Sequence, residues 1–168
     1  KGKSICEHNR IKYTCKEYFF SIEKSNMIRK ILCVDDDSIS LTISKLLLRR
    51  TGFSDVIDTA VDGSDALEYL KILFETADNF AEEAPQLILL DINMPVLNGW
   101  EFLDAYMELY ADKLPDTKVV ILSSTIDPED FSRAKKYPVV TQFLSKPLST
   151  ENLTELKEND WVASFFAA

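Results

Sequence analysis

Five short apolar runs alternate with longer segments of helical periodicity from Ile28 onward. In the longer segments the apolar residues recur every three or four positions, which is the spacing of one helix face. A right-handed helical crossover is the ordinary way to join parallel neighbouring strands. The alternation therefore predicts an α/β fold, with a three-layer, doubly wound, five-stranded parallel sheet covered by helices on both faces. The expected strands are residues 31–34, 56–61, 87–90, 119–122 and 139–144.

Residues that favour helix ends occur between these strands. They are expected N-caps at Ser38, at Ser64 and at Ser149 or Thr150, a C-terminal stop at Gly52, and a first-turn proline at Pro128. The first helix is predicted from the apolar residues that recur after Ser38, namely Ile39, Ile43, Leu46 and Leu47.

Composition limits the possible partners and location of the chain. Its 168 residues, 46% hydrophobic and 28% charged, suit one globular domain. The formal charge of -9 repels phosphate backbones, so nucleic-acid binding is not expected. Three cysteines without paired spacing argue against a disulfide framework. Since no run approaches 18 apolar residues, we expect a soluble, cytoplasmic protein with no membrane partner.

The first 26 residues differ from the rest of the chain. They hold six Lys or Arg against three Asp or Glu, a net charge of +3 that leaves -12 for the remainder. We interpret residues 1–26 as a basic extension, 27–158 as the globular domain, and 159–168 as an apolar tail that packs on the domain or frays rather than binding a partner. Met27 is a candidate natural start. Zinc binding by Cys6, His8 and Cys15 is disfavoured, because a fourth ligand and a recognised spacing are missing.

Polar residues follow four of the five expected strands. In open α/β sheets ligands bind beyond the carboxyl ends of the strands, so these residues are expected to converge at one edge. They are Asp35, Asp36 and Asp37 after the first strand, Asp91 after the third, Ser123 and Ser124 after the fourth, and Ser145, Lys146 and Pro147 after the fifth.

The convergence of carboxylates, a hydroxyl and an ammonium group predicts phosphoryl chemistry. Several carboxylates beside one lysine leave excess negative charge, which a hard divalent cation such as Mg²⁺, or Mn²⁺, would neutralise. Phosphoryl transfer depends mainly on positioning and charge neutralisation. Asp91 stands alone on the central strand and is the best candidate nucleophile.

These motifs resemble the receiver domain of two-component response regulators. The resemblance rests on the aspartates after the first strand, "LLDINMP" with Asp91, "ILSS" and "FLSKP", in order and at family-like spacing over roughly residues 28–156. It implies the flavodoxin-like strand order 2-1-3-4-5. Only "KENDWVASFFAA" follows the last helix, so we expect a stand-alone, CheY-like receiver.

The resemblance implies a role for each acidic residue. Asp91 would accept a phosphoryl group from a phosphohistidine. Asp36 would bind Mg²⁺ directly, together with Asp91 and the backbone carbonyl of Asn93. Asp35 would act mainly through a metal-bound water, while Asp37 would help to start the first helix.

The resemblance also implies how the signal is formed. Lys146 and Ser123 would bind the phosphoryl oxygens, and the Lys146-Pro147 peptide bond would be cis. Ser123 would draw in its loop, and Phe143 occupies the switch aromatic position, where it would act sterically. Phe143 is alternatively only a core residue.

The expected partners are a histidine kinase or histidine phosphotransfer protein upstream and a protein target downstream. No enzymatic activity is expected beyond Mg²⁺-dependent self-phosphorylation and autodephosphorylation.

Two other functions are alternatives to that of a phosphorylated receiver. Asp35 and Asp37 resemble the first motif of haloacid-dehalogenase-type phosphatases, but the acidic motif expected after Lys146 is missing. A receiver-like binding module that is never phosphorylated is disfavoured, because the full set of charged residues costs stability unless paired.

Overall fold

A five-stranded parallel sheet forms the centre of the protein. The computed structural model describes residues 5–8, 11–14, 27–124 and 127–166. In this part of the chain the strand order is β4-β3-β5-β6-β7, which is the predicted order 2-1-3-4-5. The strands are β3 (Ile31–Val34), β4 (Ile57–Ala60), β5 (Leu87–Asp91), β6 (Lys118–Ser123) and β7 (Val140–Ser145).

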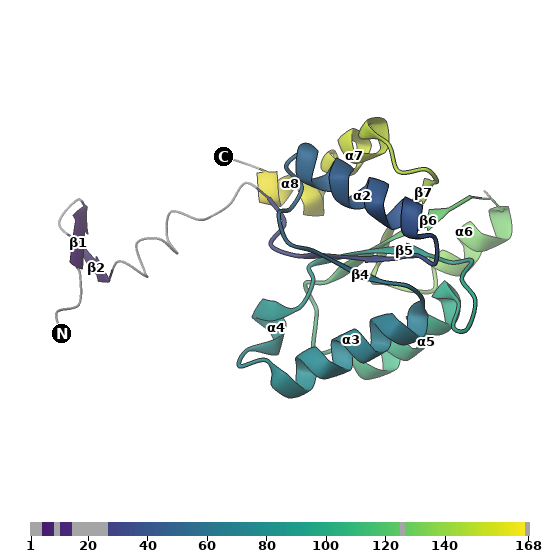
Figure 1. Ribbon diagram of the computed structural model, residues 1–168, viewed down its shortest axis with the longest axis horizontal. Coiled ribbons are helices and arrows are strands. Elements are labelled where there is room, and N and C mark those ends of the chain that lie inside the picture. The colour runs from purple at the N-terminus through teal and green to yellow at the C-terminus, as the bar shows by residue number, and fades with distance from the viewer. Residues whose placement is uncertain (1–4, 9–10, 15–26, 125–126, 167–168) are drawn as a thin grey trace.

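Helices cover both faces of this sheet, so the predicted three-layer α/β fold is confirmed (Figure 1). On one face lie α2 (Ser38–Arg50), α7 (Thr150–Lys157) and α8 (Asp160–Phe166). On the other lie α3 (Gly63–Thr76), the short α4 (Phe80–Glu83), α5 (Gly99–Leu109) and α6 (Pro128–Ala134). No helix among the described residues is long and apolar enough to cross a membrane.

Each central strand sends alternate side chains into two separate cores. On β3, Leu32 packs toward α3 and α5, whereas Ile31 and Cys33 pack toward α2 and α7. On β5, Ile88 and Leu89 divide in the same way. Strands buried on both faces need apolar residues at every position, which explains the continuous runs in the sequence.

Helix N-caps differ from two of the sequence predictions. Asp37 rather than Ser38 caps α2, and Asp62 rather than Ser64 caps α3. In both cases a carboxylate one or two residues before the serine accepts a backbone N–H of the first turn, so the serine becomes a helical residue. Three other predicted helix ends are confirmed, at Gly52, Pro128 and Ser149.

Of the four apolar residues that predicted α2, only Leu47 packs against the core, where it is partly buried. Ile39, Ile43 and Leu46 are 68%, 47% and 64% exposed. The face toward the sheet instead carries Leu41 and Leu48. The sequence of α2 has apolar residues on more than one face, so its periodicity alone does not fix which face is buried. The exposed positions form a stripe, Ile39-Ile43-Leu46, that we call the α2 apolar stripe.

The N-terminal extension contains a short antiparallel pair of strands that the sequence did not predict. β1 (Ile5–His8) pairs with β2 (Ile11–Thr14). Of the three residues weighed as zinc ligands, Cys6 and His8 belong to β1 and Cys15 lies outside the described residues.

The C-terminal segment folds into α8 and packs on the domain. Val162 is fully buried among residues of the α2 and α7 face. The ring of Phe166 lies 5.1 Å from that of Phe53, and the ammonium group of Lys157 lies 4.4 Å from the centre of the Phe166 ring. Aromatic and cation–π contacts therefore attach this segment to the loop after α2.

We expect Cys33 to resist alkylation while the protein is folded. Burial on β3, where its side chain is 2% exposed, raises the pKa of its thiol to about 12. Because the thiolate is the reactive form, iodoacetamide at pH 8 should modify Cys33 only after denaturation. Peptide mass spectrometry of native and urea-treated samples measures this. Native labelling at the rate of a free thiol would contradict the burial of β3.

Candidate functional site

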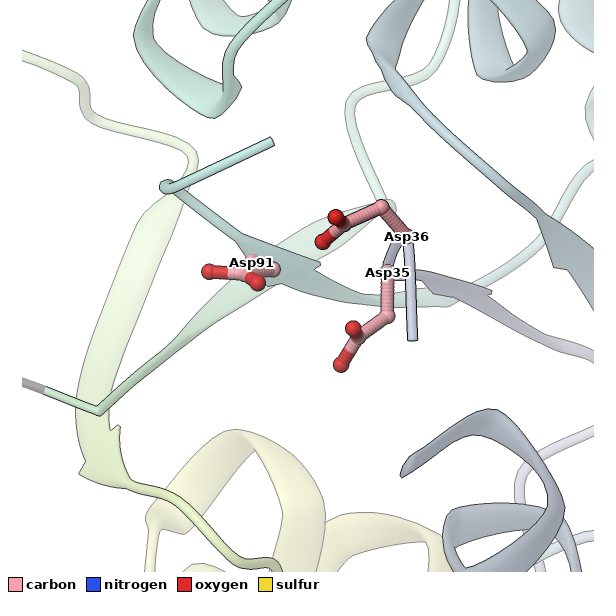
Figure 2. Close-up of side chains that lie close together, drawn as sticks. All are labelled: Asp35, Asp36 and Asp91. Atoms are coloured by element: carbon pink, nitrogen blue, oxygen red, sulfur yellow. The ribbon is translucent and has the colours of Figure 1, made fainter. Parts of the chain in front are cut away.

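The register of the sheet brings three aspartates together. Val34 pairs with Leu90, so Asp35, the next residue after β3, lies beside Asp91 at the end of β5. Figure 2 shows the side chains of Asp35, Asp36 and Asp91 close together. Each of them offers a carboxylate oxygen, and these oxygens all lie within 4.8 Å of one another. Asp35 and Asp91 are each only 5% exposed, whereas Asp36 is exposed to solvent.

Lys146 bridges two of these carboxylates. Its Nζ lies 2.5 Å from Asp35 Oδ2 and 2.7 Å from Asp91 Oδ2. Its backbone N–H donates to the carbonyl of Ser123, and its peptide bond to Pro147 is cis. Burial alone would lower the pKa of Lys146, but its hydrogen bonds to the two carboxylates and their charges raise that pKa above the ordinary value. The lysine is therefore a permanent cation at this site.

The charges at this site suit a divalent cation. Three carboxylates face one ammonium group, so negative charge is left over. Carboxylate oxygens are the hard ligands that Mg²⁺ and Mn²⁺ prefer. The donor set therefore fits the predicted metal.

The loop after β5 holds Asp91 in place. The backbone N–H of Asn93 donates to Asp91 Oδ1 at 2.9 Å. The side-chain amide of Asn93 lies 3.5 Å from the hydroxyl of Ser123, at the limit of a hydrogen bond. Ser123 itself is fully buried at the end of β6. The predicted residues Asn93 and Ser123 thus both lie beside Asp91.

Two glycines allow this loop to pack closely. A Cβ on Gly99 would lie 2.5 Å from the backbone oxygen of Asp91 and 2.7 Å from the Cα of Ile92. A Cβ on Gly63 would lie 2.7 Å from the backbone oxygen of Leu97. These three backbone atoms cannot move away from an added methyl group as the end of a flexible side chain could. Both glycines therefore allow the close packing of the loop that follows Asp91.

We expect Gly99→Ala to destabilise the protein and to displace the backbone of Asp91. The added methyl group forces the backbone of β5 to shift, at a cost of about 1–3 kcal/mol in the free energy of unfolding. Urea denaturation followed by circular dichroism measures this cost. Glu108→Ala, an exposed substitution on the same helix, is the control and should stay within about 0.5 kcal/mol of wild type. A Gly99→Ala protein as stable as this control would contradict the close approach.

The predicted switch aromatic packs against the helix after β6. Phe143 is half-buried on β7, and its ring lies 4.5 Å from that of Phe131 on α6. Phe131 is itself 39% exposed. The pair therefore joins α6 to β7 and is partly exposed to solvent.

One residue at the site was not predicted from the sequence. Ser40, in the first turn of α2, donates its hydroxyl to Asp35 Oδ2 at 2.6 Å. Its only signal in the sequence is a hydroxyl five residues after Asp35, at the start of a helix. Such a serine is common at helix starts, so the signal was too weak to select it.

Comparison with known proteins identifies the family of the chain. A family model described as the response regulator receiver domain matches residues 31–158. The chain belongs to this family. The receiver is 30% identical over 128 residues to the probable methanogenesis regulatory protein FilR2 of Methanothrix harundinacea, covering 76% of this chain and 78% of that protein.

Two further relatives show different contexts for the receiver. It is 31% identical over 137 residues to hybrid signal transduction histidine kinase B of Dictyostelium discoideum. The aligned region covers 77% of this chain but only 6% of the kinase. A crystal structure of a two component response regulator from Cytophaga hutchinsonii superposes with a TM-score of 0.70 at 31% identity, over 79% of this chain and 96% of that one. The receiver fold thus accounts for most of this chain.

Proposed function

We propose that this receiver accepts a phosphoryl group on Asp91 from the phosphohistidine of a histidine kinase or phosphotransfer protein. The observation that carries the proposal is the position of Asp91. Its carboxylate ends the central strand, with the Lys146 ammonium at 2.7 Å and two further carboxylates beside it. Phosphoryl transfer needs a nucleophile, a compensating cation and metal ligands close together, and this arrangement supports the proposal because these carboxylates and this ammonium group could supply them.

In the proposed reaction an oxygen of Asp91 attacks phosphorus. The bond between phosphorus and the imidazole nitrogen breaks, and its electron pair stays on the imidazole. The ammonium group of Lys146, which now contacts Asp91, would then pair with the negatively charged phosphoryl oxygens. Asp36, Asp91 and the Asn93 carbonyl would hold Mg²⁺ or Mn²⁺, with Asp35 beside them. The metal would neutralise charge on the transferring group.

The signal would follow from the new phosphoryl group. The buried hydroxyl of Ser123 would donate to it, and the segment after β6 would move with Ser123. Phe143 would then change its packing against Phe131. A protein target would recognise this change in the packing of Phe143. A cytoplasmic location and no catalysis beyond self-phosphorylation and autodephosphorylation are parts of the same proposal.

The α2 apolar stripe supports a protein as the phosphoryl donor. Ile39 and Ile43 line an open groove of about 330 Å³ that reaches Lys146 and Pro147. Exposed apolar residues beside a reactive site suit contact with a protein surface. A donor protein that covers this groove would bring its phosphohistidine toward Asp91.

Mass spectrometry with a small phosphoryl donor tests the proposed chemistry. The protein is incubated with acetyl phosphate and Mg²⁺, and we expect a gain of about 80 Da, the mass of one phosphoryl group. EDTA should prevent the gain, and hydroxylamine should remove it, because an acyl phosphate is labile to that nucleophile. Peptide mapping should place the label on Asp91. A label on Asp35 with rapid turnover would favour a phosphatase, and no label would favour a binding module.

A further inference from the structure

Asp35 is the most heavily hydrogen-bonded carboxylate of the site. Its Oδ1 accepts the backbone N–H of Asp37 at 3.0 Å. Its Oδ2 accepts both the Ser40 hydroxyl, at 2.6 Å, and the Lys146 ammonium, at 2.5 Å. Asp36, by contrast, faces solvent. Ser40 and Lys146 therefore share one oxygen of a buried carboxylate.

Lys146 is also shared, because it contacts Asp91 as well as Asp35. When Lys146 moves toward a phosphoryl group on Asp91, Asp35 loses part of its compensating charge. A carboxylate that is 5% exposed cannot replace that donor easily with water. The hydroxyl of Ser40 stays on the same oxygen, since it is fixed in the first turn of α2.

We propose that Ser40 is a positioning residue for phosphorylation. It keeps a hydrogen-bond donor on Asp35 Oδ2 and so allows Lys146 to leave Asp35 for the phosphoryl group. Without the hydroxyl, Lys146 is the last side-chain donor on that oxygen and is held there more tightly. This inference rests on the proposed function, because it concerns phosphorylation of Asp91.

The position of Ser40 explains why it can serve this purpose. Asp37 caps α2 with its side chain and bonds Asp35 with its backbone N–H. The start of α2 is thereby fixed against the end of β3, and Ser40 follows within the same turn. Thr42 lies two residues later on the exposed side of α2, and its hydroxyl donates to the Ser38 carbonyl rather than to Asp35. Thr42 is therefore a matched control.

Rates of phosphorylation test this proposal. Wild type, Ser40→Ala, Ser40→Thr and Thr42→Ala are phosphorylated with phosphoramidate at saturating Mg²⁺, and Mg²⁺ affinity is measured separately. We expect Ser40→Ala to react roughly 3 to 10 times more slowly, as for the net loss of one ordinary hydrogen bond. Ser40→Thr, which keeps the hydroxyl, and Thr42→Ala should stay within about twofold of wild type.

A double-mutant cycle with Lys146→Met separates positioning from a structural effect. If Ser40 acts through Lys146, Ser40→Ala should slow the Lys146→Met protein by less than about twofold. An unchanged rate in Ser40→Ala, or no rescue by Ser40→Thr, would overturn the proposal. If wild type itself accepts no phosphoryl group, it is the proposed function that fails. If wild type is labelled on Asp91 and Ser40→Ala matches it, the inference alone fails.

Discussion

Asp91→Asn is expected to reduce phosphorylation by acetyl phosphate below detection. The asparagine amide is close to isosteric with the carboxylate but lacks a nucleophilic oxygen, so no acyl phosphate can form. Its side-chain oxygen can still accept the backbone N–H of Asn93, which now bonds Asp91 Oδ1. The fold should therefore persist, as thermal unfolding followed by circular dichroism would show. Intact-mass measurement of the labelled fraction is the readout of function.

Asp37→Asn is the matched control for this loss. Asp37 stands in the same acidic cluster by sequence, but its side chain caps α2 by accepting the N–H of Ile39. Asparagine is as good an N-cap as aspartate, so phosphorylation should proceed at close to the wild-type rate. Loss of reaction in Asp37→Asn together with labelling of Asp35 would instead favour the phosphatase. Continued labelling of Asp91→Asn would show that the nucleophile is another residue.

The sheet and its polar edge could be predicted from the sequence for a simple physical reason. A strand buried on both faces needs an unbroken apolar run, and Leu87–Leu90 shows one. Parallel strands also end at one edge, so the residue after each run belongs to a common site. The approach of Asp35, Asp91 and Lys146 thus followed from chain order alone.

The details that depend on helix phase could not be predicted. The sequence predicted both a cap at Ser38 and a role for Asp37 in starting the helix, and the structure confirms only Asp37 as the cap. The burial of Leu41 and exposure of Ile39 depend on how the turn of α2 meets β3. The contact of Ser40 with Asp35 depends on the same geometry. Periodicity gives the spacing of a helix face but not its direction when several faces are apolar.

Lys146→Met is expected to destabilise the protein strongly when Mg²⁺ is absent. Lys146 is the cation between Asp35 and Asp91, whose side chains are 7% and 6% exposed. Removing it leaves two buried carboxylates in close contact without compensation, which costs about 3–5 kcal/mol in the free energy of unfolding. Urea denaturation at pH 7 in EDTA measures this cost. Lys71→Met, which removes an exposed ion pair with Glu68, is the control and should cost at most about 0.5 kcal/mol.

Magnesium should restore part of the stability lost in Lys146→Met. A ligand that binds only the folded state stabilises it in proportion to the logarithm of its concentration over Kd. In wild type a bound cation would compete with Lys146 for Asp35 and Asp91, whereas in the variant it would not. The midpoint of unfolding should therefore rise more with added Mg²⁺ in Lys146→Met than in wild type. An equal rise in both proteins would mean that the cation binds away from these carboxylates.

The difference in the free energy of unfolding between wild type and Lys146→Met should depend on pH, because the pKa of Lys146 is raised in the folded protein. A group whose pKa is higher in the folded state stabilises the protein fully below its unfolded pKa and loses that effect as pH rises through the folded value. The stability difference between wild type and Lys146→Met should thus stay constant from pH 7 to the ordinary lysine pKa of 10.5 and shrink only above it. A difference that already shrinks near pH 8 would mean that Lys146 loses its proton early and cannot be the permanent cation of the site.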